Sequence, residues 1–534
     1  MHEIRLITGR ARAALLTALV ASAASAAMAD APAPGRPPAR TYDVEAYDVD
    51  GASLMPVVDV ETAVYPFLGP DRSGADIEAA RAALEKAYRD RGYASVVVEL
   101  PAQSVADNIV RLHVVEATVG RLRVTGARFF SPDDVRRETS ALQEGQTPNI
   151  TLAQKQLADL NRAADRRVTP VLKAGAVPGT VDVELKVADS PPVHASVELN
   201  NDHNQYTTPL RTTGTVSYDN LWQLQHTATF TYAVAPENPN DTEIFAGSYL
   251  APLRHSPLTL LVSGYYSNSN LSTIAGSAVL GKGYSVGFHV IDVLPQALGL
   301  TQTLNFGLDF KNFNENITAG TSSATNDLAR YLPLSAAYTL EHDGDKAVTK
   351  ASLSVTAGTL SIGSDAASVD NKRYKAIASF VHVNLDVTQT ETLWGGFVAS
   401  QHIVGQVTDG PLVSSEEFAA GGFTSVRGYL QAEASADEGF TGALELVSPS
   451  IRGKWTSLLD DLKVYAFADG GALWLLDPLA EQKSFFSLAS AGAGLRLAML
   501  RHLKAEVALG VPFITGAATH AYRPRATFSL KSDF

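Results

Sequence analysis

The chain has no cysteine, and it has little basic charge for its length. Of its 534 residues, 43 are Lys or Arg and 56 are Asp or Glu, which gives a formal net charge of −13 at pH 7. The absence of cysteine excludes a disulfide scaffold, a thiol enzyme and cysteine-ligated zinc or iron–sulfur centres. The acidic balance argues against a nucleic-acid partner. The 12 histidines are scattered and none forms an H-E-x-x-H motif, so we expect neither a metal site nor a cofactor.

Long hydrophobic runs are also missing from most of the chain. Beyond Pro192 no apolar stretch approaches the roughly 18 residues that mark a membrane-spanning helix. A mean hydropathy of +0.00 is ordinary for a soluble protein, and it also suits a membrane β-barrel, because barrel strands alternate apolar and polar residues. The pattern along the chain must therefore decide between these two classes.

The first residues have the pattern of a secretory signal peptide. Residues 1–29 join a basic head to a short apolar middle and end in the A-x-A cleavage pattern Ala27-Met28-Ala29. Residues 30–40 contain four prolines, which prevent a helix and predict an extended leader. We therefore expect an exported protein, and an exported chain without cysteine indicates a bacterial envelope location.

Two small modules of mixed helix and strand follow, at residues 41–118 and 119–191. The first is predicted to hold an amphipathic helix and three strands, and the second a similar order of elements. The expected elements of the first are strands at 42–49, 94–100 and 108–115 and a helix at 76–92. Those of the second are strands at 120–126, 168–172 and 180–187, a helix opening at Ser131-Pro132, and a helix at about 151–166. We expect each module to expose a sheet edge.

The segment 192–534 alternates polar and apolar residues between turn-rich breaks, as at 303–310 and 502–511. This pattern predicts a transmembrane antiparallel β-barrel with apolar residues toward lipid. At roughly 20 residues per strand and connection the segment accommodates about 16 strands. Alternation alone also fits a soluble β-solenoid or sandwich. The last strand favours the barrel, because Phe528, Leu530 and the terminal Phe534 share one face.

Two short motifs stand inside the predicted barrel. The first is Val426-Arg427-Gly428-Tyr429, and the second places Phe467, Asp469 and Gly471 on one face of a strand at a period of two. An arginine inside a barrel is costly unless it is paired, and a carboxylate accepts its forked hydrogen bonds. If the second motif faces the lumen, Asp469 can therefore meet Arg427. Gly428 permits a tight loop, and Gly471 leaves room where that loop would pack.

These motifs, together with phrases in the two modules, carry a family resemblance. Residues 87–93, 110–116 and 160–172 resemble polypeptide-transport-associated (POTRA) domains. The tandem modules, the V-R-G-Y tetrad and the F-x-D-x-G strand resemble the two-partner secretion transporters of the outer membrane, which export filamentous haemagglutinins and haemolysins. The resemblance covers nearly the whole chain after the leader.

The resemblance implies a structure and a function. It implies two periplasmic POTRA domains before an outer-membrane barrel, with V-R-G-Y at the tip of a loop folded back into the lumen. It implies a partner, a large secreted exoprotein with an N-terminal secretion domain, and leaves open whether export activates that partner as a haemolysin or adhesin. The resemblance also implies that outer-membrane lipid surrounds the barrel and that the barrel-assembly machinery reads the terminal strand. Some relatives carry a helix that plugs the pore, and the short proline-rich leader predicts none here.

Two other functions remain as alternatives. An assembly factor that inserts outer-membrane proteins uses the same loop motif, although such factors typically have more POTRA modules. A passive solute porin needs neither POTRA modules nor V-R-G-Y. Enzyme activity is not expected, since the G-x-S-x-G match at 283–287 falls within a predicted strand rather than at the strand-to-helix turn that a hydrolase nucleophile requires.

Overall fold

The computed structural model describes residues 40–534 except 105–106, 255, 270, 275–276, 281, 298, 315–327, 359–372, 377–378 and 452–458. The predicted signal peptide and all but the last residue of the leader lie outside the described residues. Among the helices of the described parts, none is long and apolar enough to cross a membrane.

The first module is an α+β unit built around helix α2 (Gly74–Asp90). Ser73 caps this helix in a capping box with Asp76, which explains why the helix begins two residues before the predicted position. Its sheet has the order β2-β5-β4, and Leu84, Tyr88 and Leu112 are fully buried between helix and sheet. The other elements are β1 (Thr41–Val44), β2 (Ala46–Asp50), α1 (Val57–Val64), η1 (Tyr65–Phe67), β3 (Gly69–Ser73), β4 (Val97–Glu99) and β5 (Ile109–Val115).

The second module has its own three-stranded sheet, in the order β6-β8-β7. Helix α3 (Pro132–Glu138) begins where expected, with Ser131 as its cap and Pro132 at its first position. The expectation of a helix reaching Arg166 is wrong, because the Asn161 side chain bonds the backbone of Val168 and ends the helical pattern at Leu160. The remaining elements are β6 (Thr118–Thr125), η2 (Ser140–Leu142), α4 (Ile150–Leu160), β7 (Arg166–Ala174) and β8 (Thr180–Asp189).

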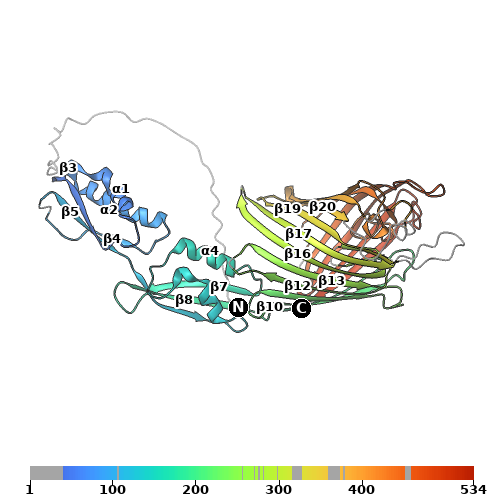
Figure 1. Cartoon of the computed structure of the whole chain (residues 1–534), viewed down its shortest axis with the longest axis horizontal. Coiled ribbons are helices and arrows are strands. Elements are labelled where there is room, and N and C mark those ends of the chain that lie inside the picture. The colour runs from blue at the N-terminus through green and yellow to red at the C-terminus, as the bar shows by residue number, and fades with distance from the viewer. Residues whose placement is uncertain are drawn as a thin grey trace, which may run out of the picture. The chain divides into compact units, whose positions relative to one another are not determined.

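The third part is a closed antiparallel β-barrel, whose long strands lie side by side in Figure 1. The order follows the sequence, and β29 pairs with β9 to close the ring. Over the described ranges the barrel has 16 strands when β18 and β19, both paired with β17, are taken as one interrupted strand. This confirms the predicted fold class.

The barrel strands have the following bounds. The first half comprises β9 (Val193–Asn200), β10 (Arg211–Leu221), β11 (His226–Val234), β12 (Glu243–Pro252), β13 (Leu258–Ser267), β16 (Lys282–Ala297), β17 (Leu300–Asn314), β18 (Leu328–Tyr331) and β19 (Pro333–Asp343). The second half comprises β20 (Ala347–Gly358), β21 (Val381–Thr392), β22 (Val398–Thr408), β25 (Glu438–Val447), β26 (Leu459–Trp474), β27 (Phe485–Met499), β28 (Leu503–Pro512) and β29 (Arg525–Asp533). A separate hairpin pairs β14 (Leu271–Ile274) with β15 (Ser277–Leu280), and η3 (Trp394–Gly396) joins β21 to β22.

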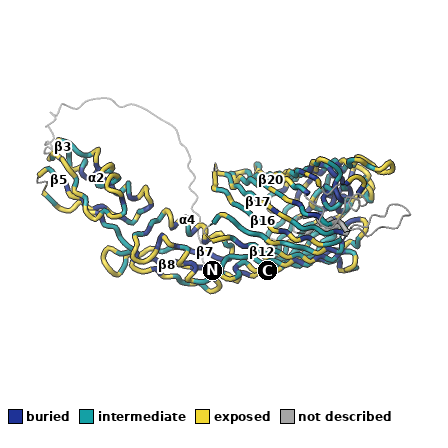
Figure 2. The backbone as a smooth tube through the Cα atoms, in the orientation of Figure 1, coloured by how far each residue is buried: buried dark blue, intermediate teal, exposed yellow. Residues whose placement is uncertain are grey.

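Exposure alternates along these strands, as Figure 2 shows. In β28, Val507 and Leu509 are about half exposed whereas Ala508 is fully buried. Large apolar side chains such as Phe230, Phe306 and Val407 are likewise exposed on other strands. An apolar outer face with a polar inner face is the arrangement of a transmembrane barrel.

Candidate functional site

The segment between β22 and β25, residues 409–437, folds against the inner wall of the barrel, and we call it the lumen loop. It contains η4 (Ser414–Glu416) and a short hairpin of β23 (Phe418–Ala420) and β24 (Ala434–Ala436). Its apolar residues form a buried cluster with Leu473 of β26 and Leu488 of β27. Val426, the first residue of the V-R-G-Y motif, is fully buried in this cluster.

Arg427 lies at the tip of the lumen loop and pairs with Asp469 in the middle of β26. Its Nε donates to Asp469 Oδ2 and its Nη2 donates to Oδ1, both at 2.8 Å, so the ion pair is bidentate. The Arg427 backbone N–H also donates to Oδ2 at 3.0 Å. The side chains are 9% and 0% exposed, respectively. The two sequence motifs therefore meet at a buried charge pair.

The wall around Asp469 supplies further partners that the sequence motifs do not include. Arg427 Nη1 donates to Glu445 Oε2 of β25 at 2.6 Å, and its guanidinium carbon lies 3.8 Å from the ring centroid of Phe467. Glu445 also accepts from Arg496 of β27, whose Nε donates to Glu506 of β28 at 3.1 Å. The arginine thus joins a chain of alternating charges across four strands. Period-two alternation places Glu445 on the inner face of β25, which is the sequence signal that could have found it.

Glycine allows the loop tip to touch the wall backbone. Gly428 has φ = +90°, a conformation that other residues rarely adopt, and a Cβ atom there would lie 3.1 Å from the carbonyl carbon of Gly510. A Cβ atom on Gly510 would lie 2.7 Å from the Gly428 nitrogen. The close approach is therefore between two backbones. A Cβ atom on Gly471 would lie 3.0 Å from the Thr441 side chain of the wall and 3.7 Å from the Val426 side chain of the loop, so this glycine leaves room where the loop packs, as expected.

Tyr429 completes the tip with its hydroxyl group inside the barrel wall. The side chain is fully buried, and its hydroxyl group donates to the carbonyl oxygen of Ile514 at 2.7 Å or of Ala489 at 3.1 Å. The returning arm of the loop is held by Glu433, which accepts from the backbone N–H groups of Ala518 (2.6 Å) and Thr519 (2.8 Å). The loop is therefore fastened on both sides of its tip.

The C-terminal residues close the ring of strands. Phe534 exchanges two backbone hydrogen bonds with Ala195 of β9, at 2.8 and 3.1 Å, and the residue as a whole is 69% exposed. Leu530 is exposed on the same strand, while the Phe528 backbone N–H donates to the side chain of Asn201 at 2.8 Å. The three residues proposed as an assembly signal thus lie at the seam between the last and first strands.

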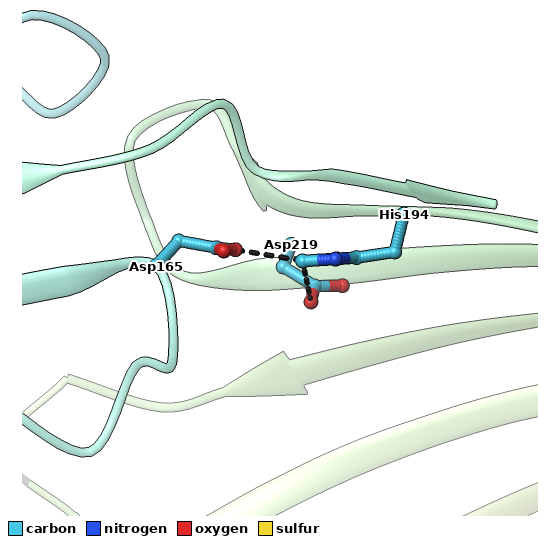
Figure 3. A group of neighbouring side chains, drawn as sticks. All are labelled: Asp165, His194 and Asp219. Atoms are coloured by element: carbon cyan, nitrogen blue, oxygen red, sulfur yellow. Dashed lines mark hydrogen bonds and ion pairs between the residues drawn. The ribbon is translucent and has the colours of Figure 1, made fainter. Parts of the chain in front are cut away.

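A second group of charged residues joins the second module to the first barrel hairpin. In Figure 3, His194 of β9 points between Asp165, which precedes β7, and Asp219 of β10. Its Nε2 lies 2.8 Å from Asp165 Oδ2 and 3.3 Å from Asp219 Oδ2. These donor atoms, all within 4.8 Å of one another, form the group that could hold a metal ion in the described part of the chain. Ser190 donates to the other oxygen of Asp165 at 3.1 Å.

In the first module a glutamate from the resemblance motif organises the core. Glu116 accepts hydrogen bonds from the backbone N–H groups of Ser53 (2.8 Å) and Leu54 (2.9 Å) and from the hydroxyl group of Tyr88 (2.9 Å). Burial alone would raise the pKa of Glu116, but the hydrogen bonds from Ser53, Leu54 and Tyr88 outweigh it and lower that pKa. The carboxylate therefore ties the start of α1 to α2 and β5.

Comparison with protein families decides what this architecture is. The model of the haemolysin secretion/activation protein family ShlB/FhaC/HecB matches residues 179–497, and that of the ShlB-type POTRA domain matches residues 42–117. The chain belongs to the ShlB/FhaC/HecB family. It is therefore an outer-membrane barrel with periplasmic POTRA structure, in a family that transports exoproteins across the outer membrane. That the second module is also a POTRA domain, and that the modules divide at residues 118 and 191, stay predictions.

Solved structures support the same fold. CdiB from Escherichia coli is 18% identical to this chain with a TM-score of 0.65, and the match covers 94% of this chain and 93% of the CdiB chain. CdiB from Acinetobacter baumannii is 14% identical with a TM-score of 0.58, and the match covers 94% of this chain and 91% of that protein. BamA from Haemophilus ducreyi lacking POTRA domains 1–3 is 14% identical with a TM-score of 0.55, and the match covers 92% of this chain and 100% of that structure. No curated protein sequence matches the chain significantly.

The hydrolase-like motif does not form the turn that a nucleophile needs. Residues 283–287 lie within β16, and Ser285 pairs in register with Tyr265 and Lys311 of the neighbouring strands. The serine is therefore part of a regular sheet and not of a strand-to-helix turn.

Proposed function

We propose that this member of the family exports one large unfolded exoprotein, recognised through its N-terminal secretion domain, and that the lumen loop is the gate. The observation that carries this proposal is the bidentate pair of Arg427 with Asp469, which holds the loop against the inner wall. A loop fastened by polar contacts can be released when a substrate competes for the lumen. Enzymatic chemistry is not part of the proposal.

Recognition is proposed to occur at the open edge of the first module. Strand β4 pairs with β5 on one side and forms the edge of its sheet, and Val97 exposes 49% of its surface there. An extended segment of the exoprotein would add to this edge by backbone hydrogen bonds. Arg81 already donates to the Val98 carbonyl oxygen at 3.1 Å, so an incoming strand must compete with it.

Transport is proposed to follow in one direction without a nucleotide. ATP does not supply energy in the periplasm, so folding of the exoprotein outside the cell must bias its movement. The substrate enters the lumen as the Arg427 tip moves aside, and the loop returns once the chain has passed.

The proposal is tested by comparing culture supernatants and outer membranes by mass spectrometry. Strains carry the wild-type chain, a deletion, Arg427→Ala or Asp469→Ala. We expect the deletion to lose one large exoprotein with the outer-membrane proteome unchanged, and both substitutions to reduce its secretion while the barrel is still inserted. Wild-type secretion by both variants would overturn the role of the loop. An unchanged supernatant with several barrel proteins depleted would replace the exporter with an assembly factor.

A further inference from the structure

A second buried carboxylate, Glu416, fastens the lumen loop at its start. It lies in η4, before the β23–β24 hairpin, and is 8% exposed. Its Oε1 accepts from Lys311 Nζ of β17 at 2.6 Å and from the hydroxyl group of Tyr331 of β18, and His382 Nε2 of β21 lies 3.4 Å from its Oε2. Three strands therefore contribute polar side chains to one loop carboxylate.

This contact is made on a different stretch of the wall from that of Arg427. In the ring of strands, β17 to β21 precede β22, whereas β25 and β26, which carry the partners of Arg427, follow it. The two contacts share no residue. The loop is consequently held to the barrel at its start as well as at its tip and returning arm, and the contact at its start lies on a separate stretch of the wall.

The surroundings of Glu416 make its contact costly to break. Leu412 and Val413 of the loop pack with Phe313, Tyr331 and Phe380 of the wall in a buried apolar cluster beside the charged groups. The amide of Gln406 donates to the carbonyl oxygens of both Glu416 (2.9 Å) and Asp437 (3.0 Å), which joins the two ends of the loop. Release of the base would therefore separate the charges of Glu416 and Lys311 and also expose this apolar cluster to water, and the contact resists release for both reasons.

We propose that Glu416, with Lys311, Tyr331 and His382, forms a base anchor that retains the lumen loop in the barrel when the Arg427 tip is released. Glu416 is then a positioning residue of the gate, and the loop moves about its base. This inference rests on the proposed role of the loop as a gate. It adds that opening has two stages, in which release of the tip does not by itself empty the lumen.

The inference is tested by single-channel conductance of the full-length protein in planar bilayers. Four proteins are compared: wild type, Arg427→Ala, Glu416→Gln, and the double variant. We expect each single variant to open rarely and the double variant to open to a large conductance at least about tenfold more often than Arg427→Ala, since a charged hydrogen bond is lost. The charge exchange Glu416→Lys with Lys311→Glu, in the Arg427→Ala background, is expected to return conductance to the level of Arg427→Ala alone.

A matched control uses Asp386, an acid on the same strand as His382 that contacts His402 at 3.2 Å. Asp386→Asn in the Arg427→Ala background is expected to leave conductance at the Arg427→Ala level. The base anchor is overturned if the double variant conducts like Arg427→Ala, or if the charge exchange conducts like the double variant. Equal amounts of heat-modifiable barrel in all proteins show that the change is in the loop. The exporter proposal fails separately, through the secretion comparison, whatever the conductance.

Discussion

Substituting Asp469 with alanine should release the tip of the lumen loop while leaving its base in place. The variant removes three hydrogen bonds from Arg427, two from the guanidinium at 2.8 Å and one from the backbone at 3.0 Å. Removing one partner of a buried ion pair generally costs about 3 to 5 kcal/mol. We expect the lower end of this range, because Glu445 still accepts from Arg427 at 2.6 Å. At about 1.4 kcal/mol per factor of ten, the released state becomes roughly a hundred times more populated.

Release of the tip can be followed by maleimide labelling of a single introduced cysteine, because the chain has no native cysteine that would also react. Ser490 of β27 pairs in register with Asp469 and is 2% exposed, so a Ser490→Cys reporter should react with a maleimide only when the tip moves away. The labelling rate of the reporter should rise about a hundredfold in the Asp469→Ala background, if opening and closing are fast compared with labelling. Asp386→Ala, elsewhere on the wall, is the control and should leave the rate unchanged. If the labelling rate in the Asp469→Ala background stayed within about threefold of the wild-type rate, as it should in the Asp386→Ala control, the reasoning would be refuted, because the ion pair would then not limit release of the tip.

Three further predictions concern other contacts. Gly510→Ala should displace the tip and speed Ser490→Cys labelling, because its Cβ atom would lie 2.7 Å from the Gly428 nitrogen, whereas Gly442→Ala, with nothing within 4 Å, should not. The lowered pKa of Glu116 means that its stabilisation is complete above the ordinary pKa of a glutamate and is lost as the pH falls through the lowered value. The protection of the Ser53 and Leu54 amides, measured as the intrinsic exchange rate at each pH divided by the observed rate, should therefore fall on acidification, and Glu116→Gln should remove that fall. Asp165→Asn should speed proteolysis between residues 160 and 195, since it weakens the contact of Asp165 with His194 at 2.8 Å, and equal cleavage of wild type and variant would argue against this junction.

Much of the fold was predictable because its signals are local. The capped helix at Ser131-Pro132 and the alternation of β28 depend on residues adjacent in the chain, and both appear where they were expected. Helix α1 was missed, because Pro56 and Val57 open a helix of only eight residues with no side-chain cap. The end of α4 was placed too late, since it depends on a hydrogen bond from Asn161 to Val168 that no helical pattern shows.

The site was predictable only in part, for a related reason. The pairing of Arg427 with Asp469 could be proposed from two motifs, because a lumen arginine requires an acid and the strand period shows which residues share a face. Glu445, Arg496 and Gly510 escaped notice because their roles depend on the lateral order and register of the strands. Glu416 escaped for a stronger reason, since its partner Lys311 is 105 residues away in the chain.

The tip and the base of the loop are held in ways that suit a gate which opens without a nucleotide. At the tip, the charges of Arg427 and Asp469 can be hydrated once they separate, although Val426 and Tyr429 must also leave a buried apolar cluster. Because water replaces the hydrogen bonds that are lost, the net cost of releasing such a contact is modest compared with its strength when closed. At the base, Leu412 and Val413 pack in an apolar cluster beside Glu416, and Glu416 lies only eight residues after Thr408, where β22 ends, so the strand restrains how far the base can move. A passing chain would therefore displace the tip before the base, and the loop could return after each translocation because its base had stayed in place.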